Sequence, residues 1–550
     1  MENETAAFDP CNGIVENGLV KAALQDLKIP NVDFGAFIRK SWIQHGEKTA
    51  VVDDATGTSC TYVELEQQCW NVAAGMHSLG FVPGDVAAFT SANSLDLVVA
   101  VFGAVFAGGK VTFVKTNLTE REVEEQLSKV SPRILFADTQ NAAKVATATK
   151  KLTSVKAFVV FGDFSGMVQF EMLRSAPKDQ FKCPTPRQPD DELFIFYTSG
   201  TTGHPKGALI THSNFVAQLF GFMSETSMFT VIDAYIGMLP FSHPLGFCVF
   251  CTMLAFGAKT VALPTLGIER LLMTAQKHEN SMLLLYPTYI RYLIEAPIPE
   301  KLDLSGVRAI LIGGSTTPMM YLKKLSKIFP RANVVCGYGL TEVSAAAVYC
   351  RRPCDDSTCL GPPVPFLEMK VVDVTTNQVL GPKECGEIRM RGPTVFKAYL
   401  NLPEETVKAF DEQGFFRTGD TGYYTVDGHF HVAGRIKDLI KCMDQQVAPA
   451  ELETLLLSHP DIREVVVSGV PHSEHGEAAR AFVVLRKGCQ GDEVMEQNLK
   501  TFLKDMVAYH KQLHGGIEFL DQLPATETGK ALRRELRDAY LKRIAKTNSS

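Results

Sequence analysis

One stretch of the sequence decides the fold: Tyr197-Thr198-Ser199-Gly200-Thr201-Thr202-Gly203-His204-Pro205-Lys206-Gly207. It follows an apolar run at 192–197 that predicts a strand, and it precedes a helix-like segment that opens near Thr211. Its glycines permit tight turns, and its hydroxyls, backbone N–H groups and lysine can surround an anion. It therefore predicts a polyphosphate-binding loop with contacts from Thr198, Ser199, Gly200, Thr201, Thr202, Gly203 and Lys206. The loop lacks Walker A spacing, and a flexible Ser/Thr/Gly turn is the alternative interpretation.

Short apolar runs recur along the chain, each followed by turn residues and a longer segment. They lie at 157–161, 192–197, 234–239, 282–286, 309–312 and 334–336. This rhythm predicts βα units and largely parallel sheets. Beyond about Gly361, segments such as 368–374 and 387–391 alternate with a period of two, which predicts a smaller antiparallel or barrel-like part.

The last part of the chain predicts a separate small domain. Beyond Gly434-Arg435-Ile436-Lys437-Asp438, apolar runs at 465–470 and 481–485 are flanked by helical patterns. We therefore predict an α/β fold with a large N-terminal region of βα subdomains, a small barrel-like part and a small α+β C-terminal domain on a hinge. The expected domains are 1–436 and 437–550; one continuous domain with a surface turn is the alternative.

Composition narrows the classes of partner. The 550 residues are 45% hydrophobic and 21% charged, which excludes a wholly disordered or coiled-coil chain. A net charge of −6 gives no electrostatic reason to expect binding to nucleic acid or an anionic membrane. The longest apolar stretch, 97–107, is too short to span a bilayer and predicts a buried helix. The sequence leaves the oligomeric state open.

The expected location is cytoplasmic. Thirteen cysteines spread over a long chain indicate reduced thiols rather than a disulfide scaffold. The first residues lack the basic start and apolar core of a signal peptide. The last three residues form no peroxisomal tripeptide, although a peroxisomal location stays open.

Four further motifs follow the loop: Gly337-Tyr338-Gly339-Leu340-Thr341-Glu342, Thr418-Gly419-Asp420, Gly434-Arg435-Ile436-Lys437-Asp438 and Pro524-Ala525-Thr526-Glu527-Thr528-Gly529-Lys530. Their type and order over about 62–536 resemble the adenylate-forming superfamily of acyl-CoA synthetases, beetle luciferases and peptide-synthetase adenylation domains. The sequence is most similar to the luciferase and 4-coumarate–CoA ligase-like branch. Five ordered motifs are far more specific than any one of them.

The resemblance implies an ATP-dependent ligase for a fatty or aryl acid. A carboxylate would attack the α-phosphorus of ATP, pyrophosphate would leave, and CoA would take the acyl group as a thioester. The implied small molecules are ATP, Mg²⁺, CoA and the acid. Because the first two reactants are anions, catalysis must neutralise charge and hold them in line.

The resemblance assigns the catalytic roles. Lys530 would contact the carboxylate and bridging oxygens, whereas a solvated lysine is the common fate of a lone Lys. Glu342 would ligate Mg²⁺, and Thr341 would contact the α-phosphate. His243 would lie beside the acyl carboxylate, with a satisfied core histidine as the alternative. Phe247, Ala345 and Ala346 are expected to line an apolar acyl pocket, with ordinary core packing as the alternative.

The nucleotide contacts also follow from the resemblance. Tyr338 would offer adenine a flat face, with core packing as the alternative. Asp420 would accept the ribose hydroxyls and Arg435 would cap the ribose, although a turn aspartate also suits Thr-Gly-Asp. Close backbone approach to the nucleotide is expected at Gly313, Gly314, Gly337 and Gly339.

The hinge motif implies two working conformations. Lys437 and Asp438 would absorb the backbone rotation, after which Lys441 and Gln446 would face the adenylate. Asp444 replaces a glycine near the expected path of pantetheine, where it could impair CoA transfer or be tolerated. Gln218 stands where the luciferase-like branch often has a basic residue, which weakens the case for light emission.

Two other functions remain open from the sequence. One is a luciferase-like monooxygenase that adenylates a luciferin and oxidises it with O₂. The other is a catalytically silent protein that binds an acyl group or adenylate; the intact Lys530, Glu342 and Asp420 argue against it. Loose spacing of Cys350, Cys354 and Cys359, and of His472 and His475, favours ordinary loop residues over a metal site.

Overall fold

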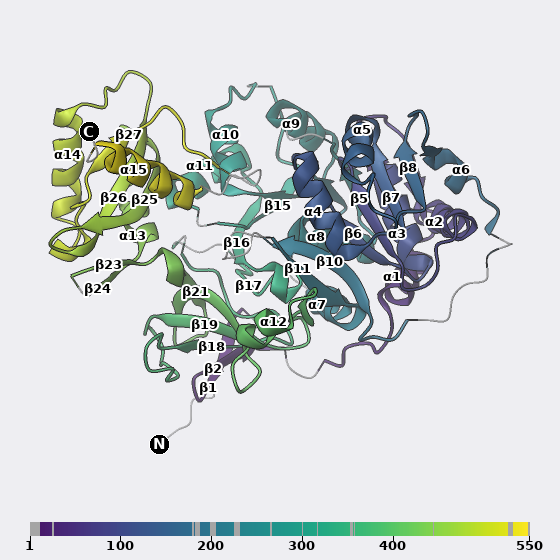
Figure 1. Cartoon of the computed structure of the whole chain (residues 1–550), viewed down its shortest axis with the longest axis horizontal. Helices are drawn as coiled ribbons and strands as arrows, with labels where there is room; N and C mark the ends of the chain where they lie inside the picture. Colours follow the sequence, from purple (N-terminus) through teal and green to yellow (C-terminus); the bar gives the residue numbers. More distant parts are fainter. Residues whose placement is uncertain are drawn as a thin grey trace.

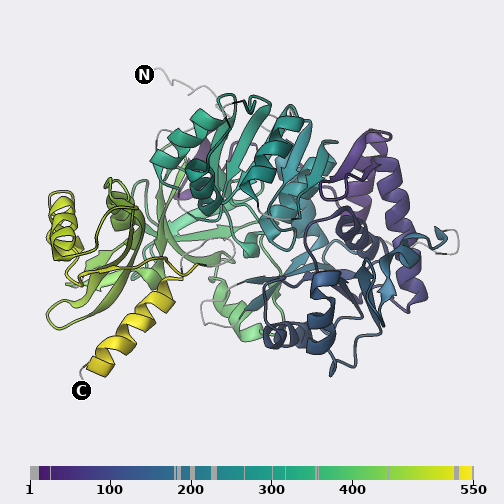
Figure 2. The ribbon, with the colours of Figure 1, turned by 90° about the horizontal axis from the view of Figure 1, so that it is seen from above.

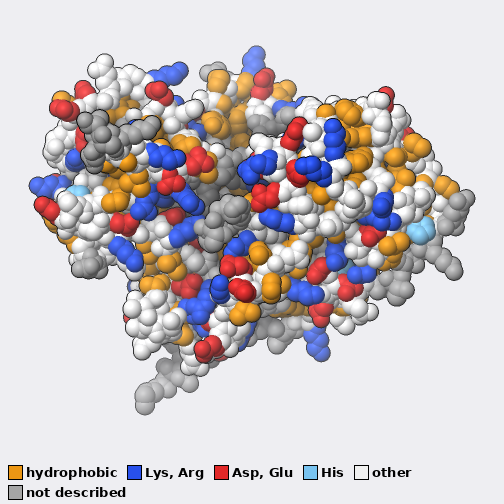
Figure 3. All heavy atoms as spheres, in the orientation of Figure 1, with side chains coloured by type: hydrophobic (Ala, Val, Ile, Leu, Met, Phe, Trp, Pro, Cys, Tyr) orange, Lys and Arg blue, Asp and Glu red, His pale blue; other side chains and the backbone are white. Residues whose placement is uncertain are grey.

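The computed structural model describes residues 11–24, 27–178, 181, 187–198, 205–224, 232–264, 267–299, 301–315, 317–352, 356, 358–443, 445–525 and 532–547. Figure 1 shows a large N-terminal region with a smaller C-terminal part at one end, and the view from above in Figure 2 agrees. Basic and acidic side chains are intermixed over the face drawn in Figure 3, as the mild net charge predicts.

The first sheet contains the strand that leads into the phosphate loop. Its order is β20-β11-β10-β6-β5-β7-β8-β9. Pairing is parallel from β10 to β9, whereas β11 and β20 are antiparallel. The bounds are β5 Val86–Thr90, β6 Lys110–Phe113, β7 Ile134–Asp138, β8 Ala157–Phe161, β9 Val168–Gln169, β10 Glu192–Thr198, β11 Lys206–Thr211 and β20 Ala398–Tyr399.

The second sheet repeats the parallel architecture. Its order is β17-β16-β15-β14-β12-β13-β3-β4, with antiparallel pairs only at its two ends. These strands are β3 Thr49–Asp53, β4 Ser59–Thr61, β12 Ala234–Gly237, β13 Lys259–Ala262, β14 Ser281–Leu285, β15 Val307–Ile312, β16 Asn333–Tyr338 and β17 Val348–Tyr349. The two sheets confirm the predicted βα architecture, and every apolar run named above contributes a strand.

Helices connect and cover these two sheets. They are α1 Phe34–His45, α2 Tyr62–Ser78, α3 Leu95–Phe106, α4 Glu120–Val130, α5 Thr139–Ala148, α6 Phe170–Arg174, α7 His212–Ser224, α8 Pro244–Ala255, α9 Ile268–Lys277, α10 Pro287–Glu295 and α11 Met319–Ile328. Helix α3 is buried along almost its whole length, which confirms the predicted buried helix. No helix in the described parts of the chain is long and apolar enough to cross a membrane.

A smaller antiparallel sheet follows, as the period-two pattern predicts. Its order is β1-β2-β18-β19-β21-β22. The strands are β1 Gly13–Glu16, β2 Leu19–Ala22, β18 Glu368–Val372, β19 Gly386–Arg391, β21 Phe416–Tyr424 and β22 Phe430–Arg435, and α12 spans Pro403–Ala409. The two N-terminal strands thus complete a sheet whose other strands lie more than 300 residues later along the chain.

The C-terminal part has its own sheet and core. Strands β23 Ile440–Cys442, β24 Gln445–Val447, β25 Ile462–His472, β26 Gly476–Leu485 and β27 Ile517–Phe519 pack with α13 Pro449–Leu456, α14 Glu493–Lys504 and α15 Arg533–Thr547. The core of this part runs from Ile440 to Ile517, separate from that of the N-terminal region. This separation supports the domain boundary at Lys437, which stays a prediction.

An ion pair joins the two parts. Arg291 of α10 donates to Glu464 of β25 at 2.5 Å, and little of either side chain is exposed. Arg463 donates to the same carboxylate at 2.8 Å. Such a pair is sheltered from solvent and costs free energy when one partner is removed. The observed arrangement of the two parts is therefore held by a specific contact.

Candidate active site

A cavity of about 500 Å³ opens where the three N-terminal sheets meet. It is bordered by the carboxyl ends of parallel strands, where ligands bind in open α/β sheets. Eleven of the residues predicted to contact the nucleotide, the magnesium ion or the acyl carboxylate line it: Thr198, Lys206, His243, Gly313, Gly314, Gly337, Tyr338, Gly339, Thr341, Glu342 and Arg435. The fold thus brings together motifs that lie far apart in the sequence.

Part of the predicted site lies outside the described residues. These positions are Ser199, Gly200, Thr201, Thr202, Gly203, Asp444 and Lys530. The two described ends of the phosphate loop, Thr198 and Lys206, both line the cavity. Lys206 begins β11, a strand that the sequence analysis did not anticipate between the loop and the helix. The apolar run after Gly207 forms this strand because it pairs with β10 in the core.

Lys206 has a carboxylate partner. Its Nζ donates to Glu405 at 2.7 Å and lies 5.1 Å from the centre of the Tyr399 ring. The hydrogen bond and charge of Lys206 hold the pKa of Glu405 below its ordinary value. Lys408 lies 3.4 Å from the same carboxylate. The charge of Lys206 is therefore partly balanced within the protein.

The adenine and ribose motifs meet at Asp420. The Tyr338 hydroxyl donates to its carboxylate at 2.6 Å, and Nε of Arg435 approaches the other oxygen at 3.0 Å. Asp420 itself is 3% exposed and lies directly behind these two cavity-lining residues. Burial, reinforced by the negative charge of Asp420, raises the pKa of Tyr338 well above its ordinary value. Tyr338 therefore keeps its proton and acts as a donor.

Glu342 presents a partly buried carboxylate to the cavity. It belongs to a short 3₁₀ turn, Thr341–Val343, and accepts a 2.9 Å hydrogen bond from the Tyr399 hydroxyl. Burial raises its pKa even though this hydrogen bond opposes the shift. Within the described residues no three potential ligands form a metal cluster. Glu342 nevertheless fits Mg²⁺, which proteins often hold through one carboxylate together with substrate phosphates.

His243 is a neutral donor at the edge of the cavity. It caps the N-terminus of α8, where its Nδ1 accepts from the Leu245 amide at 3.3 Å. Burial, assisted by the positive charge of Lys115, lowers its pKa to about 4. Because Nδ1 is the acceptor, the proton of the neutral ring lies on Nε2. His243 can thus donate to an acyl carboxylate without carrying charge.

Two glycines allow close packing within the wall of the cavity. Gly314 has a φ of +95°, and an added Cβ would lie 2.9 Å from the ring of Tyr286. A Cβ on Gly339 would lie 1.7 Å from the Ala345 carbonyl oxygen. A side chain at either position would displace the cavity wall. These features, with the flat ring of Tyr338 and the cations of the cavity, fit a nucleotide.

The apolar side of the cavity differs in part from the prediction. Ala345 and Ala346 line it as expected, together with Phe222, Val348 and Tyr349. Phe247 does not line the cavity. It is buried in the core, where its ring centre lies 5.2 Å from that of Phe194 and 5.5 Å from that of Phe113. Gln218 is buried below the alanines, with its amide oriented to donate to Ala346 O at 3.0 Å and Val343 O at 3.1 Å. It therefore supports the wall of the pocket.

Lys441 and Gln446 lie away from the cavity. Both are exposed on the β23–β24 hairpin, and the Lys441 amide donates to Glu477 at 3.1 Å. Neither lines the cavity in this arrangement of the two parts. Their expected role belongs to a second conformation and stays a prediction.

Family comparison decides the identity of the fold. Residues 38–400 match the AMP-binding enzyme family, and residues 451–530 match the AMP-binding enzyme C-terminal domain. The chain belongs to the AMP-binding enzyme family. The sequence is 31% identical over 509 residues to a luciferin 4-monooxygenase of Photuris pensylvanica, covering 90% of this chain and 93% of the relative. It is 29% identical to 4-coumarate-CoA ligase 1 of Narcissus pseudonarcissus, covering 94% and 96%.

Solved structures agree with this family. ATP-bound MatB from Rhodopseudomonas palustris superposes with a TM-score of 0.84 at 27% identity, covering 92% of this chain and 99% of that protein. A benzoate CoA ligase from Burkholderia xenovorans LB400 superposes with a TM-score of 0.80 at 26% identity, covering 92% and 99%. The chain thus has the fold of adenylate-forming CoA ligases, and use of ATP and CoA fits this family.

The sequence analysis missed several residues of this site in the AMP-binding family member. Lys115, Glu387, Tyr399 and Glu405 all line the cavity. The signal for Lys115 is a cation just past an apolar strand, at the ligand-binding edge of a parallel sheet. The register that pairs Phe194 with Val111 and Ile195 with Thr112 brings Lys115 level with Thr198. Among the described residues, no carboxylate forms an ion pair with Lys115.

Proposed function

We propose that this chain is an AMP-forming acid–thiol ligase. It activates a carboxylic acid with ATP to an acyl-adenylate, releases pyrophosphate and transfers the acyl group to CoA. The observation that carries the proposal is the convergence of the Thr198 and Lys206 loop ends, Tyr338 and His243 on one cavity. Each provides a type of contact that adenylation requires: phosphate, adenine and carboxylate, respectively.

The cations of the cavity suit two anionic reactants. Lys206 is paired with Glu405, so a bound phosphate would have to compete with this carboxylate for the lysine. Lys115 lines the cavity beside the end of β10. No carboxylate in the described part of the chain forms an ion pair with it, so its charge is available to a phosphate. We assign Lys115 to the β- and γ-phosphates, because the loop that begins at Thr198 is the expected site of polyphosphate. Its charge would favour departure of pyrophosphate.

Glu342 and Thr341 would serve the α-phosphate side of the reaction. Glu342 would give Mg²⁺ a hard oxygen ligand, and the bound ion would restore the ionised state that burial disfavours. The ion would neutralise charge on the phosphates as the carboxylate attacks. Lys530 would supply a further cation from the C-terminal part.

The acid is an apolar one, either fatty or aryl. The cavity that His243 lines has an apolar side formed by Phe222, Ala345, Ala346 and Val348. Such a surface binds a hydrocarbon or ring through burial of apolar area. The neutral Nε2–H of His243 would hold the carboxylate at the mouth of this pocket.

The two predicted domains would have different roles in the reaction. In the proposed division, residues 1–436 bind the reactants and residues 437–550 move between two positions. Lys530 would act in adenylation; Lys441 and Gln446 would approach the adenylate during thioester formation. In the observed arrangement of the two parts, both Lys441 and Gln446 are exposed and do not line the cavity. This supports the proposal that the observed arrangement is not the one in which CoA transfer takes place.

An acid panel read by two outputs tests the proposal. Fatty and aryl acids of graded size would be incubated with ATP, Mg²⁺ and CoA, and both pyrophosphate and acyl-CoA would be measured. We expect both products with at least one apolar acid. Release of pyrophosphate without formation of a thioester would restrict the activity to adenylation, and it would support the interpretation that Asp444 impairs CoA transfer. No acid-dependent pyrophosphate would overturn the proposal in favour of a silent binding protein.

A luciferase-like monooxygenase is the second candidate, favoured by the similarity to a luciferin 4-monooxygenase. Such an enzyme would adenylate a luciferin in the same cavity and then oxidise it with O₂. Photon output with beetle luciferin, ATP and oxygen separates the candidates. Light that depends on oxygen would support the monooxygenase, and its absence alongside acyl-CoA formation would support the ligase.

A further inference from the structure

The ribose motif lies on a bulge in strand β21. The pairing of β19 with β21 is regular at Glu387 and Thr421 and again at Arg389 and Arg417. Between these pairs, the three residues 418–420 of β21 face the single residue Ile388 of β19. A bulge of this kind bends a strand and redirects its side chains, and bulges are frequent next to active sites.

Side chains hold the bulge in place. The Thr418 hydroxyl donates to the Ile388 carbonyl at 2.6 Å and accepts from the Asp420 amide at 3.0 Å. Gly419 has a φ of +68°, which glycine adopts without steric cost. Its amide donates to the Glu387 carboxylate at 3.3 Å. Glu387 therefore satisfies a backbone donor that the bulge turns away from the neighbouring strand.

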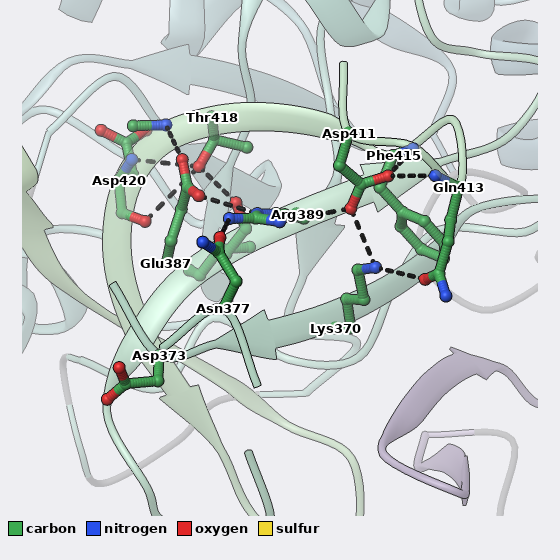
Figure 4. Close-up of polar contacts among 12 residues, drawn as sticks. Lys370, Asp373, Asn377, Glu387, Arg389, Asp411, Gln413, Phe415, Thr418 and Asp420 are labelled. Carbon is green, nitrogen blue, oxygen red and sulfur yellow. Dashed lines mark hydrogen bonds and ion pairs between the residues drawn. The ribbon is translucent and has the colours of Figure 1, made fainter. Parts of the chain in front are cut away.

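A buried ionic network in turn fixes Glu387. Nε of Arg389 donates to Glu387 at 2.7 Å, and the same guanidinium reaches Asp411 at 3.3 Å and Asn377 at 2.7 Å (Figure 4). Lys370 lies 2.9 Å from Asp411. The network contains two cations and two anions, and each of the four side chains is less than a tenth exposed. Buried charges are stable only when paired, so each member restricts the others.

Asp411 shows that pairing within the network has a larger effect on ionisation than burial does. Burial opposes ionisation, yet hydrogen bonds from Lys370 and the Phe415 amide hold the pKa of Asp411 below its ordinary value. Asp411 therefore stays charged and anchors Arg389 at the end remote from the cavity. Glu387 is the one member of the four that also lines the cavity.

We propose that Glu387 is a positioning residue for ribose recognition. Its carboxylate fixes the 418–420 bulge through the Gly419 amide, and the Arg389–Asp411–Lys370 network fixes that carboxylate. The main chain of Asp420 is thereby held while Tyr338 and Arg435 orient its side chain. This inference rests on the proposed function, because it assigns the ribose of ATP to Asp420.

Binding of two nucleotides tests the role. The affinities of ATP and of 2′,3′-dideoxy-ATP would be measured by calorimetry for the wild-type chain, Glu387→Gln, Asp420→Asn and the double variant. Glu387→Gln should weaken ATP binding on the order of tenfold, as expected when a hydrogen bond to a charged group is lost. It should leave the affinity for dideoxy-ATP unchanged. The double variant should bind ATP no more weakly than Asp420→Asn alone, since both changes remove one interaction.

Controls separate positioning from general stability. Glu368→Gln removes a carboxylate of the neighbouring strand β18 that pairs with Arg391 at 2.6 Å, and it should change neither affinity. Thermal unfolding of each variant reports folding separately. Equal weakening of both nucleotides by Glu387→Gln, or no weakening of ATP, would overturn the inference. A wild-type chain that does not bind ATP would instead refute the proposed function.

Discussion

The Tyr338 hydroxyl donates a 2.6 Å hydrogen bond to the carboxylate of Asp420, 82 residues further along the chain. This bond joins the end of β16 in a parallel sheet to a bulge in the antiparallel sheet. It couples the adenine and ribose motifs before any nucleotide arrives. A carboxylate can accept several hydrogen bonds at once, so ribose hydroxyls could be added without breaking it.

Tyr338→Phe tests this coupling. The variant keeps the flat ring for adenine but leaves buried Asp420 with one donor fewer, a loss of about 1–3 kcal/mol for a buried group. We expect the KM for ATP to rise several-fold with little change in kcat. Tyr338→Ala should raise this KM further because the ring is also lost. Equal KM values for the two variants would show that the hydroxyl accounts for the whole effect and that the ring does not contact adenine.

His243 leads to a prediction about stability at low pH. Its pKa falls from 6.5 to about 4 on folding, so between these values the unfolded chain binds the proton and the folded chain does not. Stability from the neutral ring is therefore present above pH 6.5 and is lost as the pH falls toward 4. The full loss is on the order of 3 kcal/mol.

His243→Asn should reduce this dependence. Asparagine is a good N-cap, so α8 keeps a capping acceptor while the titrating ring is removed. We expect denaturant unfolding at pH 7 and pH 5 to show a smaller difference for the variant than for the wild type. The exposed His77→Asn serves as the control and should retain the wild-type difference. A variant difference as large as that of the wild type would contradict the assignment.

Lys115 offers a test of charge at the polyphosphate. Lys115→Met should weaken ATP binding about tenfold, within the range for a hydrogen bond to a charged group. AMP binding should not change, because AMP lacks the β- and γ-phosphates. Lys115→Arg should retain most of the affinity, and Lys151→Met, which changes an exposed surface lysine, should retain all of it. If Lys115→Met left the affinity for ATP unchanged but selectively abolished activity with dicarboxylic acids, Lys115 would instead belong to the binding site of the acid substrate.

The sequence was sufficient for the architecture and for gathering the described motif residues near one cavity, but not for the side chains that support them. The glycine-rich loop that begins at Thr198 follows an apolar strand and has a local physical reason, whereas Gly314 and Tyr338 were assigned to the same site through the resemblance to the adenylate-forming superfamily. Lys115 and Glu387 reach the cavity through sheet order and register, which no local pattern encodes. The sequence could not decide between pocket and core for Phe247, because an apolar residue beside His243 suits both equally well; the structure buries it in the core.

The hinge prediction concerns two lysines of the C-terminal part. Lys530→Ala should slow acid-dependent pyrophosphate release by at least tenfold, because a cation that meets the transition-state charge contributes several kcal/mol. Lys441→Ala should leave pyrophosphate release intact and impair thioester formation from preformed acyl-adenylate. The two half-reactions would be measured separately, by isotope exchange and by acyl-CoA release. Equal damage to both half-reactions by Lys441→Ala would contradict two working conformations.

The ion pair between Arg291 and Glu464 provides a control for this model. Arg291→Met removes a contact of the observed arrangement without changing either lysine or the cavity lining. If this arrangement serves adenylation, its loss should slow pyrophosphate release while thioester formation from added acyl-adenylate is preserved or faster. Glu464 keeps Arg463 as a partner at 2.8 Å, so the variant should lose about 1.5–3 kcal/mol, the range for a hydrogen bond to a charged group, which is enough to shift a balanced equilibrium at least tenfold. A variant that slows only thioester formation would assign the observed arrangement to CoA transfer instead.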